Sequence, residues 1–336
     1  MKKLRKVLYV IVCVVAVILA VITILSVLRD TDSRFLKMLD YPRIQFFIAS
    51  AVGLILFLLL AKGWQWFDYA FALALFGVMV VQGRYIVNYT PLVSESVPSV
   101  ASGTVPSEQQ ISILLTNVMM TNRDAQPLVD LLQSEKPDII IAMEVDDWWE
   151  NQLEPLQEDY PYTQETSNSV AYGMALYSKY PLPDFSVNYL NNRKVPSYKS
   201  TLQLKNGKRL TLYSVHPVPP TRYEDLPDNE NSEEVAMIKL GQKIKNRDYP
   251  VIVAGDINDV SWGATEELTN TRGLLRDVRV GRGFYNSYNA NNVFMRWPLD
   301  HVFVTEEFQL MELERLSDIG SDHFPIYVKL SIGETR

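Results

Sequence analysis

Cysteine and histidine are scarce in this chain of 336 residues, which has one cysteine, Cys13, and three histidines. A single cysteine excludes an intrachain disulfide and any zinc or iron–sulfur site built on cysteine. The chain after Cys13 has no thiol at all, which is compatible with an oxidising compartment. Hydrophobic residues make up 47% of the chain, so its composition excludes a disordered protein.

The first ninety residues contain three long apolar runs. Val7–Leu28 and Ile44–Ala61 carry no charge, and Phe67–Val81 carries one acidic residue near its start. A helix needs about 20 apolar residues to cross a bilayer, which the first two runs supply. The third run is shorter and also fits a buried helix of a soluble protein. Its pairing with the second run across the short Lys62–Gln65 turn favours a hairpin of two spans.

A cleaved signal peptide is the alternative interpretation of the first run. The basic start MKKLRK fits a signal peptide, but the apolar core of a signal has about 7–15 residues, and no A-x-A-like cleavage site follows. We therefore predict that residues 1–87 form a membrane anchor with about three transmembrane helices.

Basic residues give competing indications of how this anchor is oriented. Four of them before the first run favour a cytoplasmic N-terminus by the positive-inside rule, but the first loop carries four more. The two groups are Lys2, Lys3, Arg5 and Lys6, and Arg29, Arg34, Lys37 and Arg43. With three spans and the N-terminus inside, everything after Ile86 lies outside the cytoplasm. The sequence thus predicts a multi-pass membrane protein with an extracytoplasmic C-terminal domain.

Residues 88–108 separate the apolar runs from the predicted globular domain, residues 109–336. They are rich in proline and serine and lack periodicity, which is typical of a flexible linker. Residues 101–336 carry a formal charge of −12, against +5 for residues 1–100. Because affinity for long nucleic acid comes mainly from basic residues that neutralise phosphates, we expect no strong binding to long DNA. Four arginines are either a basic patch or, as we favour, a solvated loop; they are Arg272, Arg276, Arg279 and Arg282.

Beyond the linker, the hydrophobic pattern changes to short strands and amphipathic helices. Continuous apolar runs at Ile139–Met143 and Val251–Ala254 are typical of buried strands. Asn206-Gly207 between two further runs predicts a β-hairpin. Residues 124–135 and 230–246 have the apolar spacing of helices. Hairpins mixed with helices predict an α/β sandwich with sheets inside and helices outside. Other strands are predicted at 111–116, 199–204, 209–215, 302–304 and 326–330.

Polar side chains gather where these apolar strands begin or end. A strand end beside a buried run can present side chains at one common face, so their recurrence in several segments predicts a single convergent site. All three histidines of the chain lie in these motifs. The residues concerned are Asn117, Glu144, His216, Asp256, Asn258, Asp300, His301, Asp322 and His323.

This set contains no nucleophile, because the chain has neither a Gly-x-Ser-x-Gly elbow nor a reactive cysteine. Its carboxylates suit a hard divalent cation. An aspartate next to a histidine offers the pairing that orients an imidazole and raises its basicity. These parts point to attack of water on phosphorus, with a metal ion that neutralises the phosphoryl oxygens.

Six short motifs, in this order, resemble the endonuclease/exonuclease/phosphatase superfamily, which is the deoxyribonuclease-I-like group. They are Thr116-Asn117-Val118, Met143-Glu144-Val145, Ser214-Val215-His216, Gly255-Asp256-Ile257-Asn258, Leu299-Asp300-His301-Val302 and Ser321-Asp322-His323. The resemblance covers residues 110–332 and is to membrane-anchored bacterial members. It implies a four-layer α/β sandwich of two packed mixed sheets flanked by helices, a hydrolase of phosphoric esters, and the bacterial plasma membrane as location.

The resemblance also implies roles for the motif residues. Asn117, Glu144 and Asp322 are expected to hold Mg²⁺, with Mn²⁺ as an alternative ion. Because Met119 replaces an acidic residue that the best-known nucleases often carry, a one-metal site is favoured. Asp256 is expected to orient or deprotonate the attacking water.

Other motif residues are expected to act on the substrate. Asn258 is expected to hold the scissile phosphate, and His216 to stabilise the developing negative charge. His323, supported by Asp300, is expected to contact the phosphate or to serve as a base. His301 has a supporting role in substrate binding, and Trp262 is a candidate for stacking on a base or sugar, although it fits a core position equally well.

We therefore expect a membrane-anchored, divalent-metal-dependent phosphoesterase that hydrolyses a phosphodiester of nuclease, phospholipid or sugar-phosphate type; a phosphomonoester is a further substrate option. The alternative is an inactive domain that serves as a membrane-anchored binding or scaffold module, although no catalytic position is lost. A function within the spans ranks last, because they carry only one charge, near an edge. No protein partner can be inferred.

Overall fold

The chain folds as two compact units, Met1–Val93 and Ser94–Arg336. The computed structural model describes residues 2–28, 34–101, 103–190, 192–219, 227, 235–263, 271 and 273–333. The two units are described separately below, beginning with the helical one.

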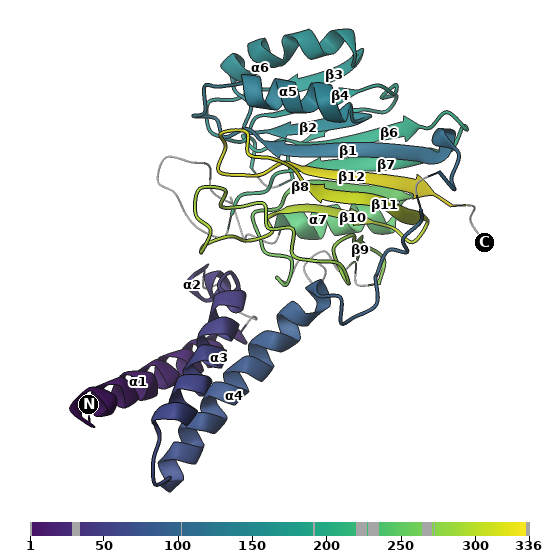
Figure 1. The fold of residues 1–336 in the computed structure, drawn as a ribbon. Coiled ribbons are helices and arrows are strands. Elements are labelled where there is room, and N and C mark those ends of the chain that lie inside the picture. The colour runs from purple at the N-terminus through teal and green to yellow at the C-terminus, as the bar shows by residue number, and fades with distance from the viewer. Residues whose placement is uncertain are drawn as a thin grey trace. The chain divides into compact units, whose positions relative to one another are not determined.

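The first unit consists of helices (Figure 1). Its long helices are α1 (Lys2–Ser26), α3 (Arg43–Leu60) and α4 (Trp66–Ile86). Among the described residues, these three are long and apolar enough to cross a membrane, which confirms the prediction of three long apolar helices. The short helical segments are α2 (Arg34–Lys37), η1 (Met38–Asp40) and η2 (Val87–Tyr89).

Reciprocal capping fixes the sharp turn between α3 and α4. Gly63 has a φ of +65°, a conformation that side chains with a Cβ rarely adopt. The backbone N–H of Gln65 then donates to Asp68 Oδ2 at 2.7 Å, while the Gln65 side chain accepts from the backbone of the same turn. This capping box begins α4 at Trp66.

A buried arginine holds the three long helices together. Arg43, on α3, is fully buried and pairs with Asp40. Its Nη1 donates to Gln82 Oε1 on α4 at 2.8 Å, and its Nη2 donates to the carbonyl of Ser26 on α1 at 3.0 Å. The guanidinium also lies 3.7 Å from the ring centroid of Tyr85. Because Asp40 supplies the opposite charge and the other partners lie on α1 and α4, this charge is compensated inside the unit.

The second unit contains two sheets (Figure 1). The strands of the first sheet are β1 (Gln110–Asn117), β2 (Ile139–Met143), β3 (Tyr162–Thr166), β4 (Met174–Ser178), β11 (Phe308–Arg315) and β12 (Ile326–Ile332). Those of the second are β5 (Ser186–Asn188), β6 (Ser197–Gln203), β7 (Arg209–Val215), β8 (Val251–Asp256), β9 (Arg276–Asp277) and β10 (Asp300–Val304). The strand orders are β11-β12-β1-β2-β4-β3 and β5-β6-β7-β8-β10-β9, six strands in each sheet. Both sheets are mixed, because β1–β2 and β7–β8 pair in parallel and the others antiparallel.

Helices cover the outer faces of both sheets. On the first sheet, α5 (Gln126–Glu135) and α6 (Asp147–Leu153) share an apolar cluster that includes the fully buried Trp149. On the second sheet, α7 (Val235–Lys245) packs through residues such as Ile244. A third apolar cluster fills the space between the two sheets. This arrangement confirms the predicted α/β sandwich of two mixed sheets with helices outside. Two short helices, η3 (Ser107–Gln109) and η4 (Glu154–Glu158), complete the unit.

The structure reproduces the strongest sequence patterns. The apolar run Ile139–Met143 is β2 itself, and all five of its residues are buried. The predicted hairpin is β6–β7, with Gly207 at a φ of +85° in its turn. The described part of the predicted helix 230–246 is α7; residues 230–234 lie outside the described residues.

Part of the segment predicted as a linker makes contacts within the second unit. Val97 is completely buried in the cluster between the sheets, and Ser96 Oγ donates to the carbonyl of Asp277 at 2.6 Å. Arg282 Nη2 donates to Glu95 Oε2 at 2.8 Å. One buried valine among prolines and serines has no periodicity, so the sequence does not reveal that this segment belongs to the second unit.

Candidate active site

Strand pairing brings the predicted polar residues to one end of the two sheets. In the first sheet, Asn117 on β1 pairs in register with Met143, the residue before Glu144. In the second sheet, Asp256 on β8 pairs with Asp300 on β10. The backbone N–H of Asp256 contacts Met143 Sδ at 3.0 Å, so the two sheets meet at this point. Side chains from the ends of several strands in both sheets can therefore share one site.

Asp256 is the centre of the cluster. Its Oδ2 lies 3.2 Å from Asn117 Nδ2, 3.5 Å from His323 Nε2 and 3.8 Å from His216 Nε2. Its Oδ1 accepts the backbone N–H of Asn258 at 2.8 Å. The side chain is 1% exposed, and burial raises the pKa of Asp256 to about 6, even though the nearby His323 charge opposes this shift.

Gly255 makes this placement of Asp256 possible. Its φ is +150°, and a Cβ at this position would lie 1.9 Å from the carbonyl oxygen of Val215. Only glycine therefore lets β8 approach the end of β7 this closely, and that approach brings His216 beside Asp256.

His323 and Asp300 form a buried ion pair. His323 Nδ1 lies 2.7 Å from Asp300 Oδ2, and the imidazole and carboxylate are both almost fully buried. Burial disfavours the charged ring, but the carboxylates of Asp300 and Asp256 outweigh that effect and raise the pKa of His323 to about 10. His323 is therefore an imidazolium at neutral pH.

Residues that the sequence reasoning did not single out hold this pair in place. Ser321 Oγ donates to the carbonyl of Asn117 at 2.7 Å and accepts the backbone N–H of His323 at 3.1 Å. Ser287 Oγ accepts the backbone N–H of Asp300 at 3.1 Å. The ring of Tyr288 lies 4.9 Å from that of His323. Ser321 is named in the Ser-Asp-His motif but is given no role there, whereas Ser287 and Tyr288 lie in a loop without a recognisable pattern.

Glu144 lies directly after β2, in a backbone conformation that is rare for a residue with a side chain, with a φ of +62°. Its Oε1 accepts from Asn117 Nδ2 at 3.0 Å, and its Oε2 accepts from the backbone N–H of Met120 at 3.2 Å. Burial raises the pKa of Glu144, the two hydrogen bonds lower it, and the charge of Asp322 adds to the rise. Asn117 therefore connects the carboxylates of Glu144 and Asp256, and Asp322 lies near enough to act on the same group.

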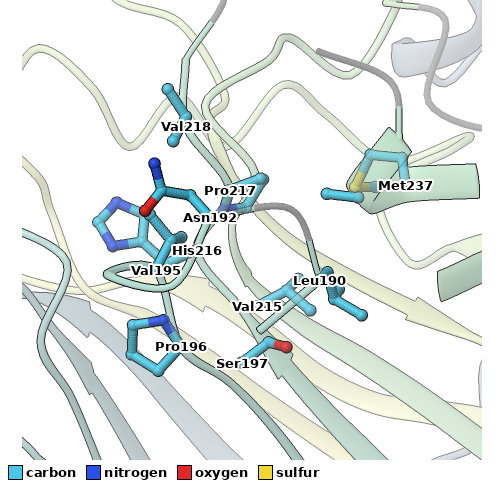
Figure 2. A pocket seen from close by; sticks show the side chains of 11 residues that line it. Leu190, Asn192, Val195, Pro196, Ser197, Val215, His216, Pro217, Val218 and Met237 are labelled. Carbon is cyan, nitrogen blue, oxygen red and sulfur yellow. The ribbon is translucent and has the colours of Figure 1, made fainter. Parts of the chain in front are cut away.

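His216 occupies the side of the cluster next to the second sheet. It is 2% exposed, and burial lowers its pKa, so the ring is neutral at physiological pH. The ring of Tyr172 packs against it at 5.1 Å. Figure 2 shows His216 at the edge of a small pocket whose lining includes Val195, Pro217 and Met237. Its Nδ1 has no hydrogen-bond partner within the described part of the chain.

The family model for the Endonuclease/Exonuclease/phosphatase family matches residues 114–323, which include every residue of this cluster. The chain belongs to this family. No curated protein matches it. The family fold and the buried Asp/His cluster together identify a phosphoesterase fold with a candidate active site.

Several solved structures have the same α/β sandwich fold as this chain. Humanized D. rerio TDP2 is 17% identical, covers 66% of this chain and 99% of its own, and has a TM-score of 0.54. The structure of D. rerio TDP2 complexed with single strand DNA product is 18% identical, covers 66% of this chain and 99% of its own, and has a TM-score of 0.54. An endonuclease/exonuclease/phosphatase family protein from Bacteroides thetaiotaomicron is 17% identical, covers 67% of this chain and 96% of its own, and has a TM-score of 0.51. At such identities the likeness concerns the fold alone.

Two predicted substrate contacts lie away from the cluster. His301 Nδ1 is bonded to the Arg279 guanidinium, and its Nε2 lies 2.8 Å from the carbonyl of Asp259. Because successive side chains of a strand point to opposite faces, His301 faces away from the side that its neighbour Asp300 occupies. Trp262 is 4% exposed and packs edge-on against Phe284, so it has no free face for a base or sugar.

Asn258 lies beside the cluster but is partly engaged elsewhere. Its backbone N–H holds Asp256, as described above, and its Nδ2 donates to the carbonyl of Pro217 at 3.0 Å. Its predicted contact with the scissile phosphate stays a prediction.

The cluster fits a divalent cation. Single side-chain atoms of Asp256, Asp300 and His323 lie within 4.8 Å of one another, and Glu144 contributes another carboxylate through its contact with Asn117. Because the protonated ring of His323 has no free lone pair, the carboxylate oxygens are the ligands on offer. Three carboxylates thus face one imidazolium. Asp300 Oδ1 is buried without a hydrogen-bond partner among the residues described. Because uncompensated buried negative charge is costly, an oxygen-rich group of this kind suits a hard metal ion.

Proposed function

We propose that the protein is a membrane-anchored, divalent-metal-dependent phosphoesterase that hydrolyses a phosphodiester by attack of water. The observation that carries this proposal is the Asp256 carboxylate, which lies within 4 Å of Asn117, His216 and His323 at the end of both sheets. The cluster contains an acceptor for a proton, a cationic donor and an oxygen-rich cation site, and it contains no nucleophile.

In this proposal Asp256 orients the attacking water and accepts its proton. With a pKa of about 6, its carboxylate is mostly ionised at pH 7 to 8 and is still basic enough to take a proton. The His323 imidazolium points Nε2 toward the same place. Since Nε2 lies 3.5 Å from Asp256 Oδ2, too far for a strong hydrogen bond, its N–H is available to a phosphoryl oxygen. His216 lines the opposite side as a neutral donor.

Glu144 and Asp322 would hold Mg²⁺, or Mn²⁺, at the first-sheet side of the cluster. Asn117, predicted as a further ligand, presents its Nδ2 donor to the carboxylates here and would orient them instead. The bound ion would neutralise charge on the phosphoryl oxygens in the transition state. The Met119 backbone N–H donates to Asn117 Oδ1 at 3.0 Å, which fixes the amide so that its Nδ2 faces both carboxylates. Met119 itself offers no oxygen from its side chain, which supports a single metal ion.

The surroundings favour a small substrate over long DNA. Within the described residues of the arginine segment, Arg276 pairs with Glu306, Arg279 is buried with Asp277, and Arg282 pairs with Glu95. Because these three arginines are paired with carboxylates, they are not available as a basic patch for DNA. Arg272 lies outside the described residues. A phospholipid headgroup, a sugar phosphate or a short nucleotide diester is therefore the proposed substrate class.

The three long helices are proposed to anchor this enzyme in the bacterial plasma membrane with the N-terminus in the cytoplasm. Lys62, in the α3–α4 turn, adds to the basic N-terminal group at one end of the bundle. At the other end, Arg43 is buried and paired with Asp40, which weakens the competing positive charge of the first loop. Three crossings then put the segment after Ile86 on the extracytoplasmic side.

Hydrolysis by the full-length protein in detergent tests the proposal. Bis-p-nitrophenyl phosphate and p-nitrophenyl phosphate would be assayed with Mg²⁺, Mn²⁺ or EDTA. We expect metal-dependent cleavage of the diester, and a loss of at least about a hundred-fold in Asp256→Asn. The exposed Asp184→Asn is the matched control and should keep full activity. Equal activity in EDTA would contradict the metal dependence, and equal activity in Asp256→Asn would contradict the role of this site. Absence of cleavage with every metal would favour a binding or scaffold module.

A further inference from the structure

A second polar pocket lies far along the chain from the candidate active site, within the helical unit. It has a volume of about 330 Å³. Its walls come from the first turns of α1, the end of α3 and the turn into α4, which lie at one end of the helices (Figure 1). A pocket of this size accommodates a small headgroup.

The pocket is strongly basic. Four cationic side chains line it, Lys2, Arg5, Lys6 and Lys62, against one carboxylate, Asp68. None of the three lysines has a carboxylate within 4.0 Å among the described residues. Like charges gathered in this way repel each other, so the pocket favours an anion.

The one carboxylate of the pocket is already engaged. Asp68 is 4% exposed, accepts the hydroxyl of Tyr9 at 2.6 Å, and caps α4 through the backbone N–H of Gln65 at 2.7 Å. Arg5 donates to the carbonyl of Leu60, the last residue of α3. These contacts fix the walls of the pocket and leave the three lysines as its unpaired charges.

The same end of the unit carries the side chains of a membrane interface. Trp66 is 80% exposed on the outside of the first turn of α4, and Phe67 and Leu60 add apolar surface to the pocket itself. Exposed tryptophan at the end of an apolar helix is typical of the headgroup level of a bilayer. A ligand that contacts both the lysines and this apolar edge needs an anionic headgroup attached to an apolar chain.

We propose that this pocket binds the phosphate headgroup of an anionic phospholipid. Basic pockets between membrane helices take such headgroups, and each lysine near an anionic surface adds to the attraction. The lysines would contact the phosphate oxygens, and Phe67 and Leu60 would contact the first methylenes of the acyl chains. The proposal rests on membrane insertion of the three helices and is independent of the hydrolytic activity.

Binding to the full-length protein in nanodiscs tests this proposal. The Asp256→Asn background with EDTA removes any turnover of the lipid. Fluorescent phosphatidylglycerol would be titrated into phosphatidylcholine discs, and inorganic phosphate and glycerol phosphate would be tried as competitors. We expect saturable binding of the lipid that Lys6→Gln/Lys62→Gln weakens at least about ten-fold.

The charge-matched control is Lys3→Gln/Arg84→Gln. Lys3 lies on the same helix turn as the pocket lysines but outside the pocket lining, and Arg84 is exposed at the far end of α4. This variant should bind like the unaltered protein. Equal binding by all variants, or equal weakening in the control, would overturn the proposal.

Two other outcomes would distinguish a free anion from a lipid headgroup and would test membrane insertion of the helices. If inorganic phosphate alone saturates the site and phosphatidylglycerol does not compete, the occupant is a free anion. The proposal of a lipid headgroup is then overturned. If the protein fails to enter the discs at all, the membrane anchor fails, and the pocket loses its ligand whether or not the enzyme is active.

Discussion

Asp300 is the residue on which the charge of His323 depends. It supplies the shortest contact to the ring, 2.7 Å to Nδ1, and its charge is the first of those that raise the pKa of His323 to about 10. An asparagine would keep the shape of the side chain and remove the negative charge. The ring would then lose its main reason to stay protonated in a buried place.

We therefore expect Asp300→Asn to lower kcat for a phosphodiester by about a hundred-fold or more. The same variant should lower the pKa of His323 by more than one unit, measured by NMR of the imidazole. The exposed Asp159→Asn is the control, and both values should stay unchanged in it. An unaltered pKa together with lost activity would show that Asp300 acts by other means than the charge of His323.

His301 is a buried neutral histidine whose tautomer is fixed by its neighbours. The Arg279 guanidinium can only donate, so His301 Nδ1 must accept, and Nε2–H donates to the carbonyl of Asp259. A proton on Nδ1 would face a cation inside the protein. Burial first, and then the Arg279 charge, hold the pKa of His301 well below its ordinary value.

This lowered pKa predicts a loss of stability in mild acid. In the unfolded chain His301 binds a proton near pH 6.5, whereas in the folded protein it stays neutral at that pH. The stabilising effect of neutral His301 is therefore complete above about pH 6.5 and declines below it. Replacement by asparagine should flatten the pH dependence of the free energy of unfolding by up to about 1.4 kcal/mol per pH unit below pH 6.5. Urea unfolding at pH 7.5, 6.5 and 5.5 checks this, and parallel curves for the two proteins would refute it.

At the scale of elements, burial on both faces decides which strands can be predicted from sequence. β2 and β8 are buried throughout, so they stand out as apolar runs. β3, at the edge of its sheet, has no buried residue and no apolar pattern. In β11 a register shift between Leu310 and Glu312 breaks the alternation of buried and exposed positions. Such strands depend on their neighbours and leave little trace in the local sequence.

The segment before β1 is an element of the same kind, and Val97 is its anchor. This valine is 0% exposed between the sheets, so Val97→Ala should lower the free energy of unfolding of the second unit by about 2 kcal/mol. Val293, 65% exposed, offers the same substitution with an expected effect near zero. Tryptophan fluorescence in a denaturant titration measures both. Equal stability of the two variants would mean that residues 94–100 are a detachable linker after all.

At the scale of the whole molecule, the sequence places the site better than it assigns roles. The strand-end rule brings Asn117, Asp256 and His323 together, and the structure has them within a few ångströms. The same rule includes His301, because residues adjacent in sequence share a strand end even when the pleat turns them apart. The packing of Trp262 depends on Phe284 from a distant loop, and no local pattern reports such a contact.

Membrane topology is the last feature that follows from the whole chain, and its one cysteine makes the topology measurable. Cys13 is buried within the helical unit, so a Cys13→Ser background is expected to fold and leaves no native thiol. Lys62, exposed in the α3–α4 turn, lies before the predicted α4 crossing, and Leu92, 83% exposed, lies after it. In intact bacterial cells, an impermeant maleimide should label Leu92→Cys at once and Lys62→Cys only after permeabilisation. The reverse pattern would put the second unit in the cytoplasm, and labelling of both sites in intact cells would mean that α4 does not cross the membrane.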